Sequence, residues 1–147
     1  MTAEQVFSFA STGILAGWLV LAFAIVRRNA FLRDQIAGRA FPLGMAMIYS
    51  TLILFFFKAD GGFGTLAEVK LLFTNDWAAL AGWVHYLAFD LFVGAWIARR
   101  VMEQGLPRLT LFLLLPTTFL FGPLGFLLFE IAQTLLRPSS QTTSTKE

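Results

Sequence analysis

The stretch GWVHYLAFDLFVGAWIARR, residues 82–100, decides the fold class of this chain. It is apolar over about the 20 residues that a helix needs to cross a bilayer, and it ends in two arginines. Within it stand His85, the only histidine of the chain, and Asp90. An ionisable side chain at the bilayer centre costs about 2.5–3.5 kcal/mol on insertion scales, so each of these residues needs a partner or a function.

The overall composition agrees with a membrane protein. Of the 147 residues, 57% are hydrophobic and the mean hydropathy is +0.71, which is more apolar surface than a soluble domain of this size can bury. The absence of cysteine excludes disulfides and thiolate chemistry, and a single histidine does not favour a transition-metal site, so we expect neither metal nor cofactor. The formal net charge of +2 is small, and we expect no nucleic-acid partner.

Four continuous apolar runs, over residues 5–26, 41–57, 77–98 and 109–136, predict four transmembrane helices. We therefore expect an all-α, integral membrane four-helix bundle that forms one domain over residues 1–136. Between the second and third runs, Leu66, Val69 and Phe73 recur at helical spacing and predict a short interfacial helix. The polar residues 137–147 are predicted to be a disordered tail.

The distribution of charge predicts an orientation. The connections after the first and third runs have an excess of arginine, whereas the middle connection carries three acidic residues against two lysines. Basic loops face the cytoplasm, so we expect a multi-pass protein with both termini on the non-cytoplasmic side.

Helix geometry separates the two ionisable residues of the third run. At about 100° per residue, His85 and Asp90 lie roughly 140° apart around the helix axis. Asp90 shares its face with Tyr86 and Gly94, whereas His85 aligns with Phe89. Two arrangements stay open: each side chain meets a different neighbouring helix, or both flank a cavity that wraps around their own helix.

Simpler roles are open for these residues and for Glu130, the ionisable residue of the fourth run. Asp90 could be a protonated carboxyl bonded to a hydroxyl of another helix, and His85 the polar end of an aromatic stripe. The predicted topology puts Glu130 in the outer half of the membrane, within reach of the other two. Alternatively, Glu130 extends toward the headgroups or pairs with Arg137.

Two glycine patterns bear on helix packing. Gly122 and Pro123 stand in the middle of the fourth run, and a proline there bends the helix and frees a carbonyl near Phe119 toward the interior. This kink either widens a pocket or serves packing alone. Gly13 and Gly17 have the spacing of close helix contact, either within the bundle or in a homo-oligomer.

Three stretches carry a resemblance to a known family: GGFGTLAEVKLLF, WAALAGWVHYLAFDLFVGAWIAR and TFLFGPLGFLLF. Together they resemble the small four-helix membrane family that is named for a plant abscisic-acid-deficient mutant and is neoxanthin-synthase-like. The similarity covers residues 41–129 and is strongest in the pattern formed by Trp83, His85, Ala88 and Asp90.

The resemblance implies a role in making or handling an isoprenoid pigment, since the plant reaction isomerises the epoxide of violaxanthin to an allenic alcohol. We therefore expect a protein that binds or acts on an isoprenoid or carotenoid-type lipid within membrane lipid. The 17 phenylalanines and 4 tryptophans would suit a groove for a flat or elongated apolar ligand. Short loops and the lack of a plastid transit extension lead us to expect a bacterial inner membrane.

Opening an allylic epoxide requires an acid at the ring oxygen and a base for a C–H proton. Our hypothesis is that Asp90 is the acid, His85 the base and Tyr86 an orienting hydroxyl. The expected substrate-binding residues are Trp83, Phe89, Gly122, Pro123 and Glu130. The alternative is a non-catalytic membrane scaffold in which Asp90 and His85 are interhelical polar contacts.

Overall fold

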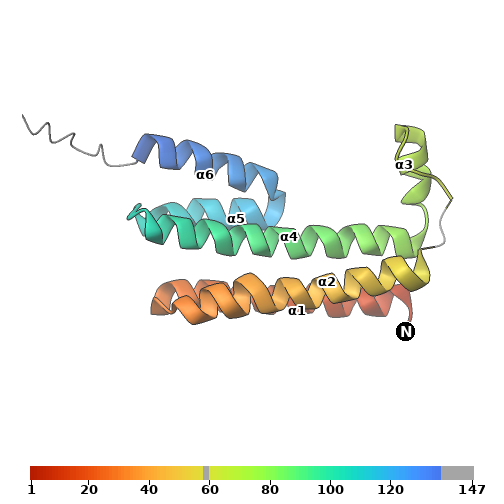
Figure 1. Ribbon diagram of the computed structural model, residues 1–147, viewed down its shortest axis with the longest axis horizontal. Coiled ribbons are helices and arrows are strands. Elements are labelled where there is room, and N and C mark those ends of the chain that lie inside the picture. Colours follow the sequence, from red (N-terminus) through yellow and green to blue (C-terminus); the bar gives the residue numbers. More distant parts are fainter. Residues whose placement is uncertain (58–59, 137–147) are drawn as a thin grey trace, which may run out of the picture.

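The computed structural model describes residues 1–57 and 60–136, and within these ranges every regular element is a helix, which confirms the all-α class. Figure 1 shows the arrangement along the length of the molecule. The elements in chain order are α1 (Ala3–Arg27), η1 (Leu32–Ala40), α2 (Phe41–Thr51), η2 (Leu52–Phe56), α3 (Leu66–Leu72), α4 (Asp76–Glu103), η3 (Arg108–Thr110), α5 (Leu111–Phe121) and α6 (Pro123–Leu136).

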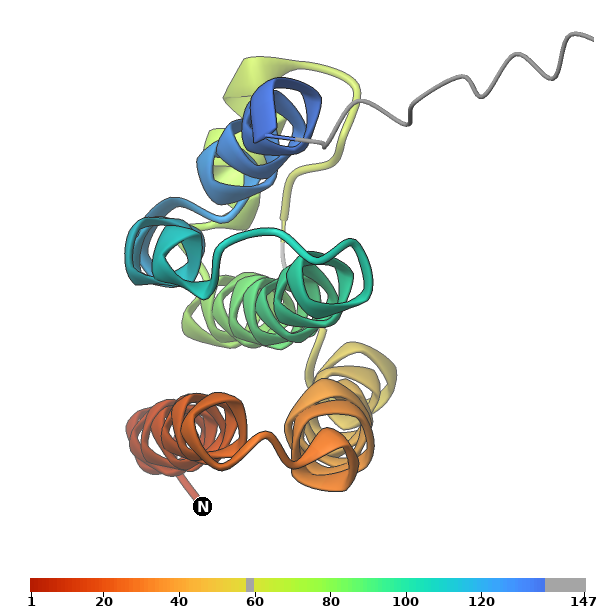
Figure 2. The ribbon, with the colours of Figure 1, turned by 90° about the vertical axis from the view of Figure 1, so that its left-hand side faces the viewer.

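Three helices in the described ranges are long and apolar enough to cross a membrane: α1, the continuous helix Leu32–Phe56 formed by η1, α2 and η2, and α4. The most apolar window of α4 is 56% buried inside the protein, against 11% for that of Leu32–Phe56. α4 is therefore the central helix. α1 and α2 pack side by side against one side of it, and α5 and α6 lie on the other (Figure 2).

The prediction of a single fourth helix over residues 109–136 is wrong, because the run breaks at Gly122 into α5 and α6. α5 runs back along α4 as far as Tyr86, whose hydroxyl contacts the carbonyl of Leu120. α6 then returns, and Gln133 near its end meets Gln104 at the end of α4. The two short helices thus form a hairpin that covers only one half of α4 (Figure 1), instead of a fourth crossing.

The break has a local cause in two adjacent residues. Gly122 adopts φ 22° and ψ −80°, outside the helical region and at a positive φ that favours glycine. Pro123, the first residue of α6, has no N–H and cannot continue the hydrogen-bond ladder of α5. Gly125 lets α6 approach α5 closely, since a Cβ there would overlap the side chain of Thr118. The proline and the two glycines therefore favour a tight hairpin over a kinked continuous helix.

The second helix begins earlier than predicted, at Leu32 in place of Phe41, so that the basic connection is itself helical. Arg33 explains this extension. Arg33 is buried, with 9% of its surface exposed. Its guanidinium donates two 2.7 Å hydrogen bonds to the carboxylate of Asp34 and lies 2.8 Å from Sδ of Met102 on α4. A buried guanidinium that is paired in this way holds the first turns of the helix against the end of α4.

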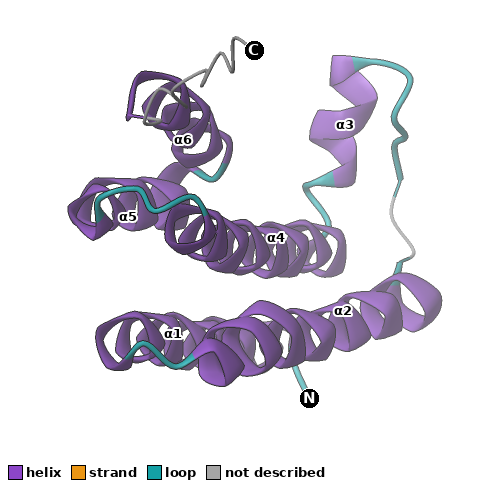
Figure 3. Ribbon diagram, turned by 60° about the vertical axis from the view of Figure 1, so that its left-hand side comes forward, coloured by secondary structure: helices purple, strands orange, loops and turns teal. Residues whose placement is uncertain are grey.

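The predicted short helix between the second and third runs is present as α3. Thr65 and Glu68 cap its first turn reciprocally: the Thr65 hydroxyl accepts from the Glu68 N–H, and the Glu68 carboxylate accepts from the Thr65 N–H. Figure 3 shows α3 turned away from the direction of the long helices, beyond the start of α4. Its location at a membrane interface stays a prediction.

The beginning of α1 and the end of α6 lie at opposite ends of the bundle (Figure 1). Within residues 1–136 the two ends of the chain therefore do not lie at the same end of the bundle, and the membrane side of each terminus stays a prediction. The predicted disordered tail, residues 137–147, lies outside the described residues.

Gly17 of α1 packs inside the bundle, where a Cβ would lie 2.6 Å from Leu91 and 3.0 Å from Phe41.

Candidate functional site

The buried carboxyl of Asp90 lies at the turn of the α5–α6 hairpin. Asp90 is only 6% exposed, and its Oδ1 packs so closely against Gly122 that a Cβ on that glycine would overlap it. Oδ2 is also buried and has no hydrogen-bond partner among the described residues. A buried polar atom without a partner is uncommon in native proteins and calls for an explanation.

Tyr86, one turn earlier on α4, connects this carboxyl to the end of α5. Its hydroxyl lies beside Asp90 and donates a 2.8 Å hydrogen bond to the carbonyl of Leu120, with that of Phe119 at 3.5 Å. These carbonyls belong to the last turn of α5, whose hydrogen bonds end at Gly122. A phenol has one hydrogen, so while it donates to Leu120 it can only accept from Asp90. A protonated Asp90 would complete that chain.

Aromatic side chains of α1 and α4 surround the approach to Tyr86. The ring of Trp83 lies 5.6 Å from that of Tyr86 and 5.7 Å from that of Phe7, and its indole N–H donates to Ser11 at 3.0 Å. Further along α4, Trp18 packs against Gly94, where a Cβ would lie 2.5 Å from its ring, and its ring centroid lies 5.4 Å from that of Phe119. The hairpin stops short of Trp83, which remains 39% exposed.

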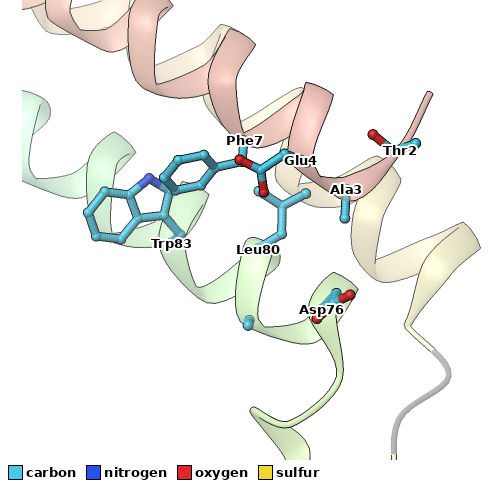
Figure 4. A pocket seen from close by; sticks show the side chains of 8 residues that line it. Thr2, Ala3, Glu4, Phe7, Asp76, Leu80 and Trp83 are labelled. Atoms are coloured by element: carbon cyan, nitrogen blue, oxygen red, sulfur yellow. The ribbon is translucent and has the colours of Figure 1, made fainter.

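A pocket of about 500 Å³ opens between the first turns of α1 and of α4 (Figure 4). The carboxylates of Glu4 and Asp76 stand at its rim, one on each helix, and the rings of Phe7 and Trp83 form its inner wall. Trp83 contacts Tyr86 in turn, so the indole ring stands between this pocket and the tyrosine beside Asp90.

His85 belongs to a different pocket, of about 380 Å³, on the α2 side of α4. Its imidazole centroid lies 5.6 Å from the ring of Tyr49 and 4.7 Å from that of Phe89. Asp90 faces the hairpin turn instead, across the helix. The structure therefore selects the first of the two arrangements open to the sequence, in which each side chain meets a different neighbour. It does not bring the hypothetical acid and base together.

The remaining predicted residues divide between these places. Trp83 lies next to Tyr86. Gly122 contacts Asp90, and Pro123 follows Gly122 at the turn. Phe89 lies on the other side of α4, against His85. Glu130 is far along α6, where it accepts a hydrogen bond from Gln133, at the end of the bundle where α4 finishes. The fold separates it from both sites because α6 runs away from the hairpin turn.

Sequence reasoning missed what α1 contributes, namely the rings of Phe7 and Trp18. Nothing in their spacing distinguishes them from lipid-facing residues. It did anticipate a freed carbonyl near Phe119, because a proline always removes one backbone donor. The acceptors that Tyr86 uses are this carbonyl and the next one.

Among residues 1–57 and 60–136, no group of three or more histidine, aspartate or glutamate side chains is arranged to hold a metal ion. The fold and the site thus define a helical protein, with three described helices long and apolar enough to cross a membrane and a buried carboxyl and hydroxyl pair at the turn of a short hairpin. The chain belongs to the ABA4-like family, described as ABA DEFICIENT 4-like, whose match covers residues 5–129. No curated protein and no solved structure matches it.

Proposed function

We propose that this protein is a multi-pass membrane protein that binds an isoprenoid or carotenoid-type lipid and isomerises it by acid–base chemistry at Asp90. The observation that carries the proposal is the buried Asp90 carboxyl, with one unpartnered oxygen, beside the Tyr86 hydroxyl at the hairpin turn. Membership in the ABA4-like family supports the choice of lipid.

Asp90 is suited to give a proton. Burying an unpaired charge is costly, so the neutral carboxyl is the form that such surroundings favour. Tyr86 holds that carboxyl in one orientation while it is itself fixed by the Leu120 carbonyl. An acid whose position is fixed before the substrate arrives contributes typically 10²–10⁴-fold to rate when it transfers a proton in the transition state.

The separation of His85 from Asp90 changes the proposed chemistry from a pair of residues to a single carboxyl. Asp90 protonates the epoxide oxygen, the C–O bond breaks, and the resulting carboxylate removes a proton from the adjoining carbon as the new double bond forms. The carboxyl ends as it began, so the isomerisation needs no oxidant, reductant or net proton. His85 has no part in these steps.

The substrate would approach from the end of the bundle where α1 and α4 begin. Arginines cluster at the other end, which by the positive-inside rule faces the cytoplasm. The 500 Å³ pocket with Phe7 and Trp83 then lies in the non-cytoplasmic half of the membrane, and the ring that carries the epoxide would have to pass Trp83 to reach Asp90. The polyene would remain in lipid beside the uncovered half of α4.

The test is conversion in reconstituted vesicles. Purified protein in liposomes that contain violaxanthin is followed by chromatography and mass spectrometry for an isomer of unchanged mass. We expect Asp90→Asn to reduce conversion by about 100-fold or more and Tyr86→Phe by less, because the phenol positions the acid without itself reacting. Glu103→Gln, which removes a carboxylate at the opposite end, is the matched control. Full conversion by folded Asp90→Asn would refute the proposal.

The alternative is a scaffold, and one contact favours it. Tyr86 ties α4 to the last turn of α5, so the Asp90–Tyr86 pair could serve only to hold the hairpin in place. In that case Asp90→Asn and Tyr86→Phe would loosen the hairpin, and wild-type vesicles would convert none of the epoxide. Comparing thermal stability with turnover in the same preparations separates the two functions.

A further inference from the structure

Two adjoining pockets lie between α4 and the long helix formed by η1, α2 and η2, in the half of the bundle where α4 ends. The smaller, of about 50 Å³, is lined by Trp96 and Arg99 among others. The larger, of about 370 Å³, is lined by Arg39 and by apolar residues nearer the middle of both helices. Gly38 and Phe92 line both pockets, so the two form one continuous hollow. We call it the arginine groove.

The crossing of η1 and α4 brings two arginines to the same end of this groove. A Cβ on Gly38 would lie 3.0 Å from that of Ala95, so the two helices approach closely at this point. Arg39 directly follows Gly38, and Arg99 lies one turn beyond Ala95 on the same face of α4. The arginine groove therefore has one arginine from each helix where α4 ends.

No strong ion pair neutralises these two arginines. The carboxylate of Asp34, which also lines the groove, accepts two 2.7 Å hydrogen bonds from Arg33. Arg99 lies 3.7 Å from Glu103, and its Nε is buried without a hydrogen-bond partner. Arg39 forms no ion pair in the part of the chain that the structure describes. Two positive charges thus remain for an anion, and phosphate suits them because guanidinium groups bind its oxygens in pairs.

The groove is as long as one leaflet of a membrane. Its α4 residues extend from Ala88 to Arg99, which at 1.5 Å per residue is about 16 Å. Half of the hydrocarbon core of a bilayer is about 15 Å. Trp96 lies one turn before Arg99, and tryptophan is enriched where the hydrocarbon meets the headgroups. The groove therefore has a charged end at the level of the headgroups and an apolar remainder that reaches the middle of the bilayer.

Side chains of unequal length create the apolar part of the groove. Ala46 and Ala88 contribute short side chains, whereas Leu43, Phe89 and Phe92 contribute long ones. The three long side chains are each about half exposed, so they stand at the protein surface beside the alanines. An alkyl chain that fills the hollow covers apolar surface on both helices.

We propose that the arginine groove binds one anionic phospholipid, with its phosphate at Arg39 and Arg99 and one acyl chain along Leu43 and Phe92. Segments 27–40 and 99–110 at this end of the bundle contain seven arginines and two carboxylates, which also favours a negatively charged headgroup. A lipid held in this way binds η1 and α4 together and stabilises the folded bundle.

This inference rests on the membrane placement in the proposed function and not on its chemistry. The groove faces η1 and α2, whereas the α5–α6 hairpin and its turn lie on the other side of α4 (Figure 2). The lipid is therefore a bound structural ligand and is separate from the substrate.

The test counts bound lipid. The whole protein in mild detergent is mixed with dioleoyl phosphatidylglycerol, or with dioleoyl phosphatidylcholine, which has the same acyl chains and no net charge. Native mass spectrometry measures bound lipid per chain. We expect one phosphatidylglycerol per chain and about tenfold weaker binding of phosphatidylcholine. Excess inorganic phosphate should not displace the lipid, because it lacks an acyl chain. Displacement by phosphate would show an anion site alone and would overturn the proposal.

Charge variants locate the headgroup. Arg39→Gln and Arg99→Gln should each weaken phosphatidylglycerol binding about tenfold and leave phosphatidylcholine binding unchanged. Neither residue is buried and the Arg99 pair with Glu103 is weak, so both variants should fold, which thermal unfolding without added lipid checks. Arg108→Gln is the matched control, since it removes a charge from the same end at an exposed residue that lines neither pocket. An equal loss in Arg108→Gln would indicate general attraction and overturn the proposal.

A bulky variant locates the acyl chain. Ala46→Phe places a ring in the apolar part of the groove, and it should weaken the binding of both lipids about tenfold. Met47→Phe changes the next residue of α2, which is 68% exposed and does not line the groove, and it should bind lipid like wild type. Unchanged binding by Ala46→Phe would refute the placement of the chain.

The lipid site and the proposed function fail separately. Equal binding of the two lipids by wild type, or wild-type binding by Arg39→Gln and Arg99→Gln, would overturn the lipid site. Asp90→Asn should bind phosphatidylglycerol like wild type. If wild type binds this lipid but converts no epoxide, the groove stands and the Asp90 chemistry does not. If conversion proceeds while both lipids bind equally, the Asp90 chemistry stands and the lipid site does not.

Discussion

The hydroxyl of Tyr86 and the main-chain carbonyl of Leu120 lie 2.8 Å apart and join the central helix to the end of α5. This bond satisfies a carbonyl that the break at Gly122 leaves without a helical partner. A hairpin that turns back inside a membrane must satisfy such groups internally, since lipid offers none. The same bond fixes the phenol beside Asp90, so the stability of the hairpin and the geometry of the candidate site depend on one contact.

Replacing Tyr86 by phenylalanine should therefore destabilise the protein by about 0.5–1.5 kcal/mol, the usual value of one hydrogen bond. The measurement is thermal unfolding in detergent at constant lipid content. Tyr49→Phe is the control, because the ring of Tyr49 keeps its contact with His85 after the substitution. Equal stability of Tyr86→Phe and wild type would show that the hairpin does not depend on this bond.

A Gly122→Ala substitution should be more damaging, with a loss of about 1–3 kcal/mol, because overpacking in a well-packed interior forces its neighbours to move. The added Cβ would overlap Oδ1 of Asp90, and the positive φ of Gly122 is strained for alanine. Gly44→Ala provides the comparison, since nothing lies within 4 Å of a Cβ there and alanine is the better helix former. A tolerated Gly122→Ala would argue against the close contact with Asp90.

The buried arginine at the start of the second long helix should depend on its carboxylate. Asp34→Ala leaves the guanidinium of Arg33 without its two 2.7 Å hydrogen bonds, and we expect a loss of about 1–3 kcal/mol. Glu103→Ala breaks only exposed pairs of 3.7 Å with Arg99 and Arg100, and should change stability by about 0.5 kcal/mol or less. Similar losses in the two variants, measured by thermal unfolding, would contradict a structural role for Arg33.

The hairpin predicts which residues share a side of the membrane. The chain has no cysteine, so Thr2→Cys, Glu103→Cys and Thr134→Cys each introduce a single thiol. In sealed vesicles of known orientation, a membrane-impermeant maleimide should label Glu103→Cys and Thr134→Cys from one side and Thr2→Cys from the other. Labelling of Thr134→Cys together with Thr2→Cys would show instead that residues 109–136 cross the membrane.

Much of the fold could be predicted from residues that act locally. The apolar runs predicted the three long helices to within a few residues, except for the start of the second. That helix begins at Leu32, in a polar stretch that the hydrophobic pattern could not identify as helical and that Arg33 stabilises through Met102 of α4. The capping pair of Thr65 and Glu68 accompanies the short helix that was predicted there. The resemblance to the family was confirmed over residues 5–129.

The candidate site was predictable only in part. Asp90 and Tyr86 stood out as neighbours on one face of a helix, because helical spacing is a property of the chain alone. The angular separation of His85 and Asp90 around the helix followed from the same spacing. Whether one cavity contains both side chains depended on how α2 and α5 pack against α4. Glu130 was assigned to the wrong end of the bundle, because a fourth crossing was assumed where α6 turns back.

By itself, the sequence determined that the chain is helical, that its long helices are apolar enough to cross a membrane, and that a carboxyl, a phenol and an imidazole lie on its third apolar run. These properties follow from hydrophobicity and from backbone geometry within a few turns. Only the tertiary structure decided that the fourth run folds back at Gly122, that Tyr86 takes the carbonyl of Leu120, and that His85 and Asp90 serve different surfaces. Whether a proline and glycine pair bends a helix or reverses it depends on which distant side chains satisfy the freed carbonyls, and those partners come from packing.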